Sequence, residues 1–504
     1  MKFKTFLAGC LGGLLSLNSC TNSPDMTDYA AYVNPFIGTG GHGHTFPGAI
    51  VPHGMISPSP DTRIDGWDAC SGYYYADSTI NGFSHTHLSG TGCCDYGDVL
   101  LMPTVGEQKY LPTGSQSQQM AYASAFSHQN ETAEPGYYSV FLDTYQVKAE
   151  LTASKRAAIH RYTFPESKEA GFILDLDYSL QRQTNKEMEI EVISPTEICG
   201  RKKTMYWAFD QYINFYAKFS KPFTYTLVTD SMALDDGGRL LPTCKALLHF
   251  DTTKDEQVFV KVGISAVDIE GARKNVETEI PDWDFDGVRK DARKAWNETL
   301  SKIDITTNDK NDKTIFYTAL YHTAISPNLF TDVDGRYLGM DLQVHQGDTL
   351  NPMYTIFSLW DTFRALHPLM TIIDPDLNNA FIRSLIKKHQ EGGIFPMWDM
   401  ASNYTGTMIG YHAVPVIVDA YMKGDRNFDI QEAYRACVRA AEYDTTGIKC
   451  PDLVLPHLMP KAKYYKNSIG YVPCDRENES VAKALEYAYD DWCISVFADA
   501  LNDY

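Results

Sequence analysis

The residue types best suited to chemistry gather between Asn34 and Asp98. This segment holds the run Gly38-Thr-Gly-Gly-His-Gly-His44, then Gly66-Trp67-Asp68, then the glycine-bounded run 82–92 with two further histidines. Glycine lets a backbone approach a ligand closely, an indole offers a flat apolar face for a sugar ring, and Asp and His can hydrogen-bond its hydroxyls. The combination predicts a surface that binds carbohydrate.

Two His-x-His pairs lie in this segment, His42/His44 and His85/His87. A pair with this spacing could ligate a metal, with zinc as the default, and a zinc-dependent hydrolase is one hypothesis. Neither a third histidine nor a carboxylate stands at a recognisable ligand spacing, so we favour histidines that are hydrogen-bonded within glycine-rich loops. We therefore predict no metal ligand in this chain. The first run also lacks the Lys-Ser/Thr of a phosphate-binding loop.

A second candidate segment is Trp360-Asp361-Thr-Phe-Arg364. On a helix Asp361 and Arg364 stand three residues apart on one face, so they could hold each other and present a fixed carboxylate to substrate hydroxyls. Trp360 or Phe363 would pack behind them. An ordinary surface ion pair is the alternative.

Two further segments are relevant to the site. The glycine-rich stretch 392–400 followed by 408–412 is suited to the binding edge of a helical domain. Asp490 and Asp491 are adjacent, so on a helix they point about 100° apart and do not form an acid and base pair.

Short alternating segments dominate the chain from about residue 30 to 270. Aromatic and β-branched residues alternate with polar ones between Gly, Pro, Asn and Asp, which predicts a β-sandwich. The clearest strand segments are 137–141, 158–164, 172–176, 212–219 and 258–262.

Longer segments with a period near 3.6 residues follow Pro281 and predict about seven helices. We expect the domain boundary near 270–283. The last helix is amphipathic and lacks a closing cap signal, so we expect its apolar face to pack on further structure. The predicted helices are 284–303, 312–325, 359–372, 377–391, 406–423, 430–445 and 479–501.

The composition limits the kinds of partner that the protein can bind. The 504 residues carry 44 Lys+Arg against 64 Asp+Glu, a formal net charge of -20, which argues against nucleic acid and favours a neutral substrate. Nine cysteines follow Cys20 without any Cys-x-x-Cys pair. We therefore expect small buried side chains and no zinc ribbon or regular disulfide framework.

The N-terminus has the layout of a secretory signal: Lys2 and Lys4, an apolar run 6–17, then Ser19-Cys20. We expect residues 1–19 to be a signal peptide and Cys20 to be acylated, with 20–29 as a lipidated tether. Export to the bacterial outer membrane follows, on its periplasmic or its surface face. A plain cleaved signal is the alternative.

These motifs together resemble glycoside hydrolase family 92, whose characterised members are bacterial exo-acting α-mannosidases. The resemblance runs from about residue 30 to the end of the chain. The matching segments are 32–39, 47–49, Gly66-Trp67-Asp68, 82–92, 96–99, 360–364 with 367–369, 410–412 and 485–492.

The resemblance implies an N-terminal β-sandwich, residues 30–270, followed by an (α/α)6 catalytic domain from residue 271 to 504. It also implies inverting, calcium-dependent hydrolysis of terminal α-mannosidic bonds in N-glycans or mannan. By this resemblance Gly66 and Trp67 contact mannose from the sandwich, and Asp361 and Arg364 bind its hydroxyls from the helical side.

The family's segments with the general acid, the base and the calcium ligands are absent from this sequence, and seven helices are fewer than the twelve of an (α/α)6 barrel. We therefore expect an incomplete barrel whose C-terminal part is missing, no catalytic residue or calcium ligand within this chain, and no activity from it alone. A lipid-anchored, non-catalytic glycan-binding protein is the alternative.

Overall fold

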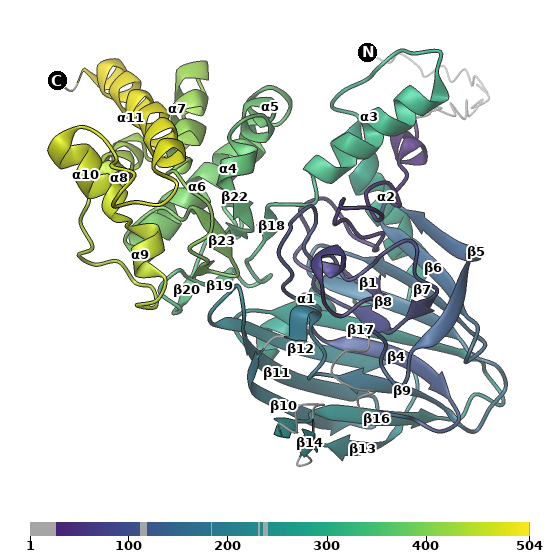
Figure 1. Ribbon diagram of the computed structural model, residues 1–504. Coiled ribbons are helices and arrows are strands. Elements are labelled where there is room, and N and C mark those ends of the chain that lie inside the picture. The colour runs from purple at the N-terminus through teal and green to yellow at the C-terminus, as the bar shows by residue number, and fades with distance from the viewer. Residues whose placement is uncertain (1–26, 111–117, 183, 230–231, 235–239, 503–504) are drawn as a thin grey trace, which may run out of the picture.

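The computed structural model describes residues 27–110, 118–182, 184–229, 232–234 and 240–502. A β-sheet half and a helical half lie side by side (Figure 1). The predicted signal peptide and Cys20 fall outside the described residues. Among the described helices, none is long and apolar enough to cross a membrane.

The larger sheet of the N-terminal half has nine strands in the order β10-β11-β12-β17-β8-β7-β6-β5-β2. All neighbours pair antiparallel. Its strands are β2 (Thr79–Ile80), β5 (Ser124–Glu134), β6 (Tyr137–Leu142), β7 (Val147–Ala153), β8 (Ala157–Thr163), β10 (Thr184–Ser194), β11 (Glu197–Met205), β12 (Gln211–Phe219) and β17 (Gln257–Ser265).

The second sheet has six strands in the order β1-β3-β4-β9-β16-β13, and β14 (Met232–Leu234) pairs with β15 (Leu240–Pro242) in a separate two-stranded sheet. Side chains from both large sheets form one buried apolar cluster, including Leu101, Phe172 and Leu248 from one and Tyr138 and Val260 from the other. The predicted β-sandwich is confirmed, and so are all five of the segments predicted as strands. The six strands are β1 (Ser59–Asp61), β3 (Gly82–Ser84), β4 (Leu100–Val105), β9 (Ala170–Asp175), β13 (Thr224–Val228) and β16 (Lys245–Phe250).

Helices α1 (Ile269–Glu279) and α2 (Phe285–Leu300) pack on the outer face of the nine-stranded sheet. Asp268 caps α1 by accepting from the NH of Gly271, and Asp284 caps α2 in the same way at Gly287. We missed α1 in the sequence. Both helices pack on the sheet although they follow it in the sequence. The predicted domain division at residue 270 stays a prediction.

The helical half confirms that a sandwich is followed by helices, with some boundaries different from those predicted. Gly410, at φ 84°, and Met408, at φ 71°, adopt left-handed conformations, so the predicted helix 406–423 begins only at Ala413. We missed α9 and α10. The helices are α3 (Lys310–Thr323), α4 (Leu359–Thr362), α5 (Leu366–Ile373), α6 (Pro375–Gly392), α7 (Ala413–Lys423), α8 (Ile430–Ala441), α9 (Leu455–Leu458), α10 (Lys461–Ile469) and α11 (Ser480–Leu501).

The helical half also contains short strands. β22 (Phe357–Ser358), β23 (Trp398–Met400) and β24 (Asn403–Tyr404) form a small sheet beside α4, and two hairpin-like pairs join β18 (Asn328–Leu329) with β21 (Tyr354–Thr355) and β19 (Arg336–Leu338) with β20 (Val344–Gln346). In Figure 1 β22 and β23 lie between α4 and the strands of the sandwich. They therefore stand where the two halves meet.

Helix α11 buries one face and exposes the other. Tyr487, Cys493 and Phe497 pack into the core shared by α6, α7 and α8. Leu485 and Trp492, on the other face, are 68% and 59% exposed.

Candidate functional site

Trp67 begins the short 3-10 turn η2 (Trp67–Ala69) and is 57% exposed, although it is a large apolar side chain. Gly66 precedes it at φ 94° and ψ 166°, a backbone conformation that only glycine adopts readily. The indole meets the ring of His44 edge to face, with centroids 4.7 Å apart. A Cβ built on Gly92 would stand 2.4 Å from the indole, so a side chain there would displace the ring. The result is a supported aromatic surface open to solvent.

Two cysteines hold the backbone of this turn. The Cys70 thiol donates to the carbonyl of Trp67 at 2.9 Å, and the Cys94 thiol donates to the carbonyl of Gly66 at 3.5 Å. All nine described cysteines are free thiols, and six of them are buried. The expectation of small buried side chains without a disulfide framework fits the majority of them.

The second His-x-His pair is hydrogen-bonded within the sandwich. His85 Nδ1 lies 2.6 Å from the carbonyl of Val99, and His87 lies 2.7 Å from the carbonyl of Ser57 and 2.8 Å from Asp61 Oδ1. The hydrogen-bonded interpretation is confirmed for this pair. Burial lowers the pKa of His85 to about 4, so its ring is neutral.

Asp95 joins the loop that carries Gly92 to the connection between β11 and β12. Its carboxylate accepts from the backbone NH groups of Tyr96, Trp207 and Ala208, at 2.7, 3.1 and 3.0 Å. Burial raises the pKa of Asp95 to about 7, against the lowering effect of these NH groups. Asp95 thereby fixes Trp207 relative to the loop beneath Trp67.

Trp207 carries the connection into the helical half. Its ring lies 4.2 Å from the ring of Trp398 on β23, and its Nε1 donates to the hydroxyl of Thr407 at 2.6 Å. Trp398 Nε1 in turn donates to Ser358 Oγ at 2.7 Å, and Ser358 Oγ donates to Asp361 Oδ2 at 2.5 Å. A continuous series of contacts therefore joins the loop under Trp67 to Asp361.

The predicted pairing of Asp361 with Arg364 is wrong. Helix α4 ends at Thr362, and Arg364 Nη2 donates instead to Glu486 Oε1 on α11, at 3.2 Å. The cause is Pro368: in an unbroken helix its ring would clash with the carbonyl of residue 364. The guanidinium does lie over the rings of Trp360 and Phe363, at 4.7 and 4.8 Å, as the packing prediction requires.

Glu486 is the point where three helical elements meet. Besides Arg364 it accepts from Trp360 Nε1 at 3.0 Å, and its other oxygen lies 3.2 Å from His412 Nε2. His412 Nδ1 lies 2.8 Å from the buried Asp490, whose second oxygen accepts from the NH of Tyr411 at 2.8 Å. Burial raises the pKa of Asp490, while the contact with His412 opposes that rise.

Asp491 turns to other partners, Tyr411 OH at 2.5 Å and Lys466 at 2.6 Å. The two adjacent carboxyls therefore serve different structural contacts, as their helical spacing predicts.

Several residues of this surface were not singled out from the sequence. They are Asp95, Trp207, Ser358 and Glu486. Glu486 lies within a segment that matches the family, which was the available signal. Nothing near Trp207 in the sequence marks it, because its partners stand about two hundred residues away.

A cavity of about 950 Å³ lies away from these residues, lined by α1, α2, α3 and the β7–β8 turn. His53, Arg156 and Glu279 are among its lining residues. None of Trp67, Asp361 and Arg364 lines it, so the candidate site rests on the contact series and not on this cavity.

Comparison with known proteins decides the family. Residues 32–265 match the glycosyl hydrolase family 92 N-terminal domain, and residues 271–504 match the glycosyl hydrolase family 92 catalytic domain. The chain belongs to glycoside hydrolase family 92.

Solved structures of the family are similar over nearly the whole chain. A family GH92 α-mannosidase from Bacteroides thetaiotaomicron is 37% identical with a TM-score of 0.85, covering 94% of this chain and 63% of its own. The same enzyme has been solved in complex with mannoimidazole. An inverting family GH92 mannosidase from that organism is 30% identical with a TM-score of 0.81, again covering 94% and 63%.

A curated relative, a secreted glycosidase of Arthroderma benhamiae, is 26% identical over 94% of this chain and 60% of its own length. This chain therefore spans less than two thirds of the length of the relatives it matches.

The calcium expected of the family finds no matching ligand set among the described residues. Only one group of three or more His, Cys, Asp or Glu side chains there brings its ligand atoms within 4.8 Å of one another, namely His42, His44 and Asp68. Calcium takes six to eight oxygen ligands, so two imidazoles and one carboxylate do not fit it.

Proposed function

We propose that the protein to which this chain belongs hydrolyses terminal α-mannosidic bonds, with inversion, in N-glycans or mannan. The observation that carries the proposal is family membership over the whole described fold, together with 37% and 30% identity to an α-mannosidase and an inverting mannosidase. The mannoimidazole complex of the first relative supports mannose as the sugar.

The geometry supports the sugar-binding part of this proposal. Trp67 offers an exposed aromatic face next to the positive-φ backbone of Gly66, and Asp361 and Arg364 are held in place by Ser358 and Glu486. We propose that the indole packs on the apolar face of mannose while the carboxylate and the guanidinium bind its hydroxyls.

Inversion needs a protonated carboxyl at the leaving oxygen and an ionised one that activates water, roughly 6.5–9.5 Å apart. Asp490 and Asp491 are committed to His412, Tyr411 and Lys466, so we assign neither role to them. We include calcium dependence in the proposal only because of the family resemblance.

Binding is tested by calorimetry of the 504-residue chain with α-mannobiose. We expect Trp67→Ala to abolish the heat of binding. Trp492→Ala is the matched control, because that indole is 59% exposed on α11, against 57% for Trp67. Equal heats for the two variants would exclude Trp67 from the site.

Hydrolysis is tested with the protein expressed from its full reading frame and α-1,2-, α-1,3-, α-1,4- and α-1,6-linked mannobiose. We expect release of mannose that appears first as the β-anomer by NMR and stops on chelation of calcium. Absence of release from all four would contradict the proposal, and sugar binding without release would favour the glycan-binding alternative. We expect no chelator-sensitive release from the 504 residues by themselves.

Export and lipid anchoring complete the proposal. They are supported by the charged, apolar and Ser19-Cys20 layout of the N-terminus and by the secreted relative. Incorporation of labelled palmitate into the wild type and its loss in Cys20→Ser would support the anchor. Equal labelling of both would contradict it.

A further inference from the structure

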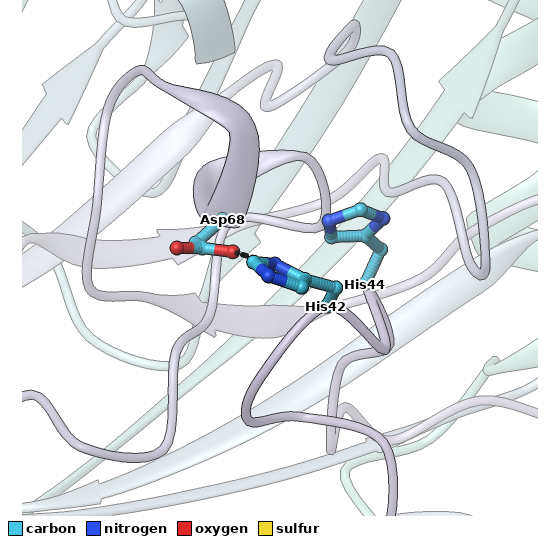
Figure 2. Close-up of side chains that lie close together, drawn as sticks. All are labelled: His42, His44 and Asp68. Atoms are coloured by element: carbon cyan, nitrogen blue, oxygen red, sulfur yellow. Dashed lines mark hydrogen bonds and ion pairs between the residues drawn. The ribbon is translucent and has the colours of Figure 1, made fainter.

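Three side chains beside Trp67 converge from two segments that are distant in sequence. His42 and His44 come from the glycine-rich loop, and Asp68 comes from the turn η2 (Figure 2). One ligand atom from each lies within 4.8 Å of the others. His42 Nδ1 stands 2.8 Å from Asp68 Oδ1. The sandwich therefore builds a cluster that the His-x-His spacing by itself did not reveal.

His44 has an unused ring nitrogen. The residue is only 8% exposed, and its Nε2 is buried without a hydrogen-bond partner among the described residues. A buried polar atom without a partner costs free energy, about 1–3 kcal/mol, and such atoms in folded proteins call for an explanation.

The cluster also has an open side. The side chain of His42 is 75% exposed and that of Asp68 is 29% exposed, whereas His44 is buried. A hydrated ion can reach the cluster from solvent, and its remaining positions can be filled by water. Since His42 is a loop side chain in solvent, it can close on an ion without disturbing the core.

The donor set determines the class of ion. Two imidazole nitrogens and one carboxylate oxygen are ligands of zinc and related divalent transition metals, whereas calcium and magnesium prefer oxygen alone. Zinc bonds of about 2.0–2.1 Å at tetrahedral angles place ligand atoms roughly 3.3 Å from one another. His42 Nδ1 and Asp68 Oδ1, now 2.8 Å apart, would therefore separate slightly, and the His44 nitrogen, within 4.8 Å of both, would need only a side-chain movement to join them.

We propose that His42, His44 and Asp68 form a binding site for a divalent transition metal, zinc in the first place, separate from the calcium expected of the family. The bound ion would join the loop 38–44 to the turn η2. Because Asp68 directly follows Trp67 and the ring of His44 supports the indole, the metal would hold Trp67 in place without touching the sugar.

The test uses the 504-residue chain, dialysed against zinc and freed of excess ion by gel filtration, with bound zinc measured by mass spectrometry. We expect one tightly bound zinc ion in the wild type and at least a tenfold loss of affinity in His42→Ala and in Asp68→Asn. His457→Ala, an exposed histidine on α9, is the matched control and should bind as the wild type does.

Cobalt distinguishes this site from binding by thiols. We expect the absorption of Co²⁺ bound through nitrogen and oxygen, without a thiolate charge-transfer band, and quenching of the part of the indole fluorescence that Trp67→Phe removes. A thiolate band, zinc binding that His42→Ala and Asp68→Asn leave unchanged, or no binding in the wild type would each overturn the proposal. None of these measurements involves a sugar, so their failure leaves the proposed mannosidase function unaffected.

Discussion

The sandwich and the helical half contribute to the same candidate site, but they hold their residues in different ways. The loops around Trp67 rest on a core that both sheets close, and their charged groups find partners within the sandwich, as the buried pair Lys202–Asp98 does at 2.9 Å. In the helical half Arg364 depends on Glu486 and His412 on Asp490, both on α11, a helix that leaves Leu485 and Trp492 exposed on its other face. The first half is self-supporting, whereas the second relies on one helix distant in sequence.

The largest effect should come from breaking a buried charge pair of the sandwich. Lys202→Met leaves the buried Asp98 carboxylate without its cation, so we expect a loss of about 3–5 kcal/mol in the free energy of unfolding. Urea unfolding followed by circular dichroism measures it. Arg201→Met is the matched control on the same strand, because Arg201 is 57% exposed in its side chain and should change stability by under about 0.5 kcal/mol. Equal losses for the two would contradict a closed, self-supporting sandwich.

The corresponding change in the helical half is Asp490→Ala. It leaves His412 Nδ1 and the NH of Tyr411 without their acceptor, at a cost of about 2–4 kcal/mol. We expect hydrogen exchange to accelerate in residues 405–412 and 480–501 while the strands of the sandwich keep their protection. Asp499→Ala, an exposed carboxylate on the same helix, is the control. Faster exchange throughout the sandwich would show that the halves are not independent.

The buried carboxyl of Asp95, which holds Trp207 near the helical half, should make the free energy of unfolding depend on pH. Its pKa is raised by burial to about 7, so between pH 4 and 7 the folded state holds a proton that the unfolded state has lost. The contribution of Asp95 to stability is present below this range and is lost as pH rises. We expect a decrease of about 2 kcal/mol in the free energy of unfolding from pH 5 to pH 7.

Urea unfolding at several pH values measures this decrease, which Asp95→Asn should remove. Asp286→Asn is the control, because that side chain is 75% exposed. A slope that Asp95→Asn leaves unchanged would rule out Asp95 as its source.

The smallest change in stability should follow from Arg364→Met. Its side chain is 47% exposed and its ion pair with Glu486 is near the surface, so we expect a loss under about 1 kcal/mol. A double-mutant cycle with Glu486→Gln should give a coupling energy of the same small size. The heat of mannobiose binding should nevertheless fall strongly, because the guanidinium serves the sugar rather than the fold. Full binding by the variant would remove Arg364 from the proposed site.

Much of the fold could be predicted because periodicity is a local property. The alternation in 212–219 and 258–262 marks strands β12 and β17, and the 3.6-residue pattern of 377–391 marks α6 to within a few residues. Predictions failed where one residue overrides a pattern. The helix expected at 359–372 breaks before Pro368. The helix expected from residue 406 begins only at Ala413, after the left-handed residues 408 and 410.

The sequence by itself determined the family, the sandwich followed by helices, and the kinds of residue at the site, because each of these depends on residue type and on spacing along a few turns or strands. Only the tertiary structure decided the partners. Arg364 pairs with a residue 122 positions away and His42 with one 26 positions away. No local pattern encodes such contacts, because they arise when a helix or loop packs against another element of the fold. For the same reason Asp68 joined the two histidines only in three dimensions, although the His-x-His spacing was visible from the start.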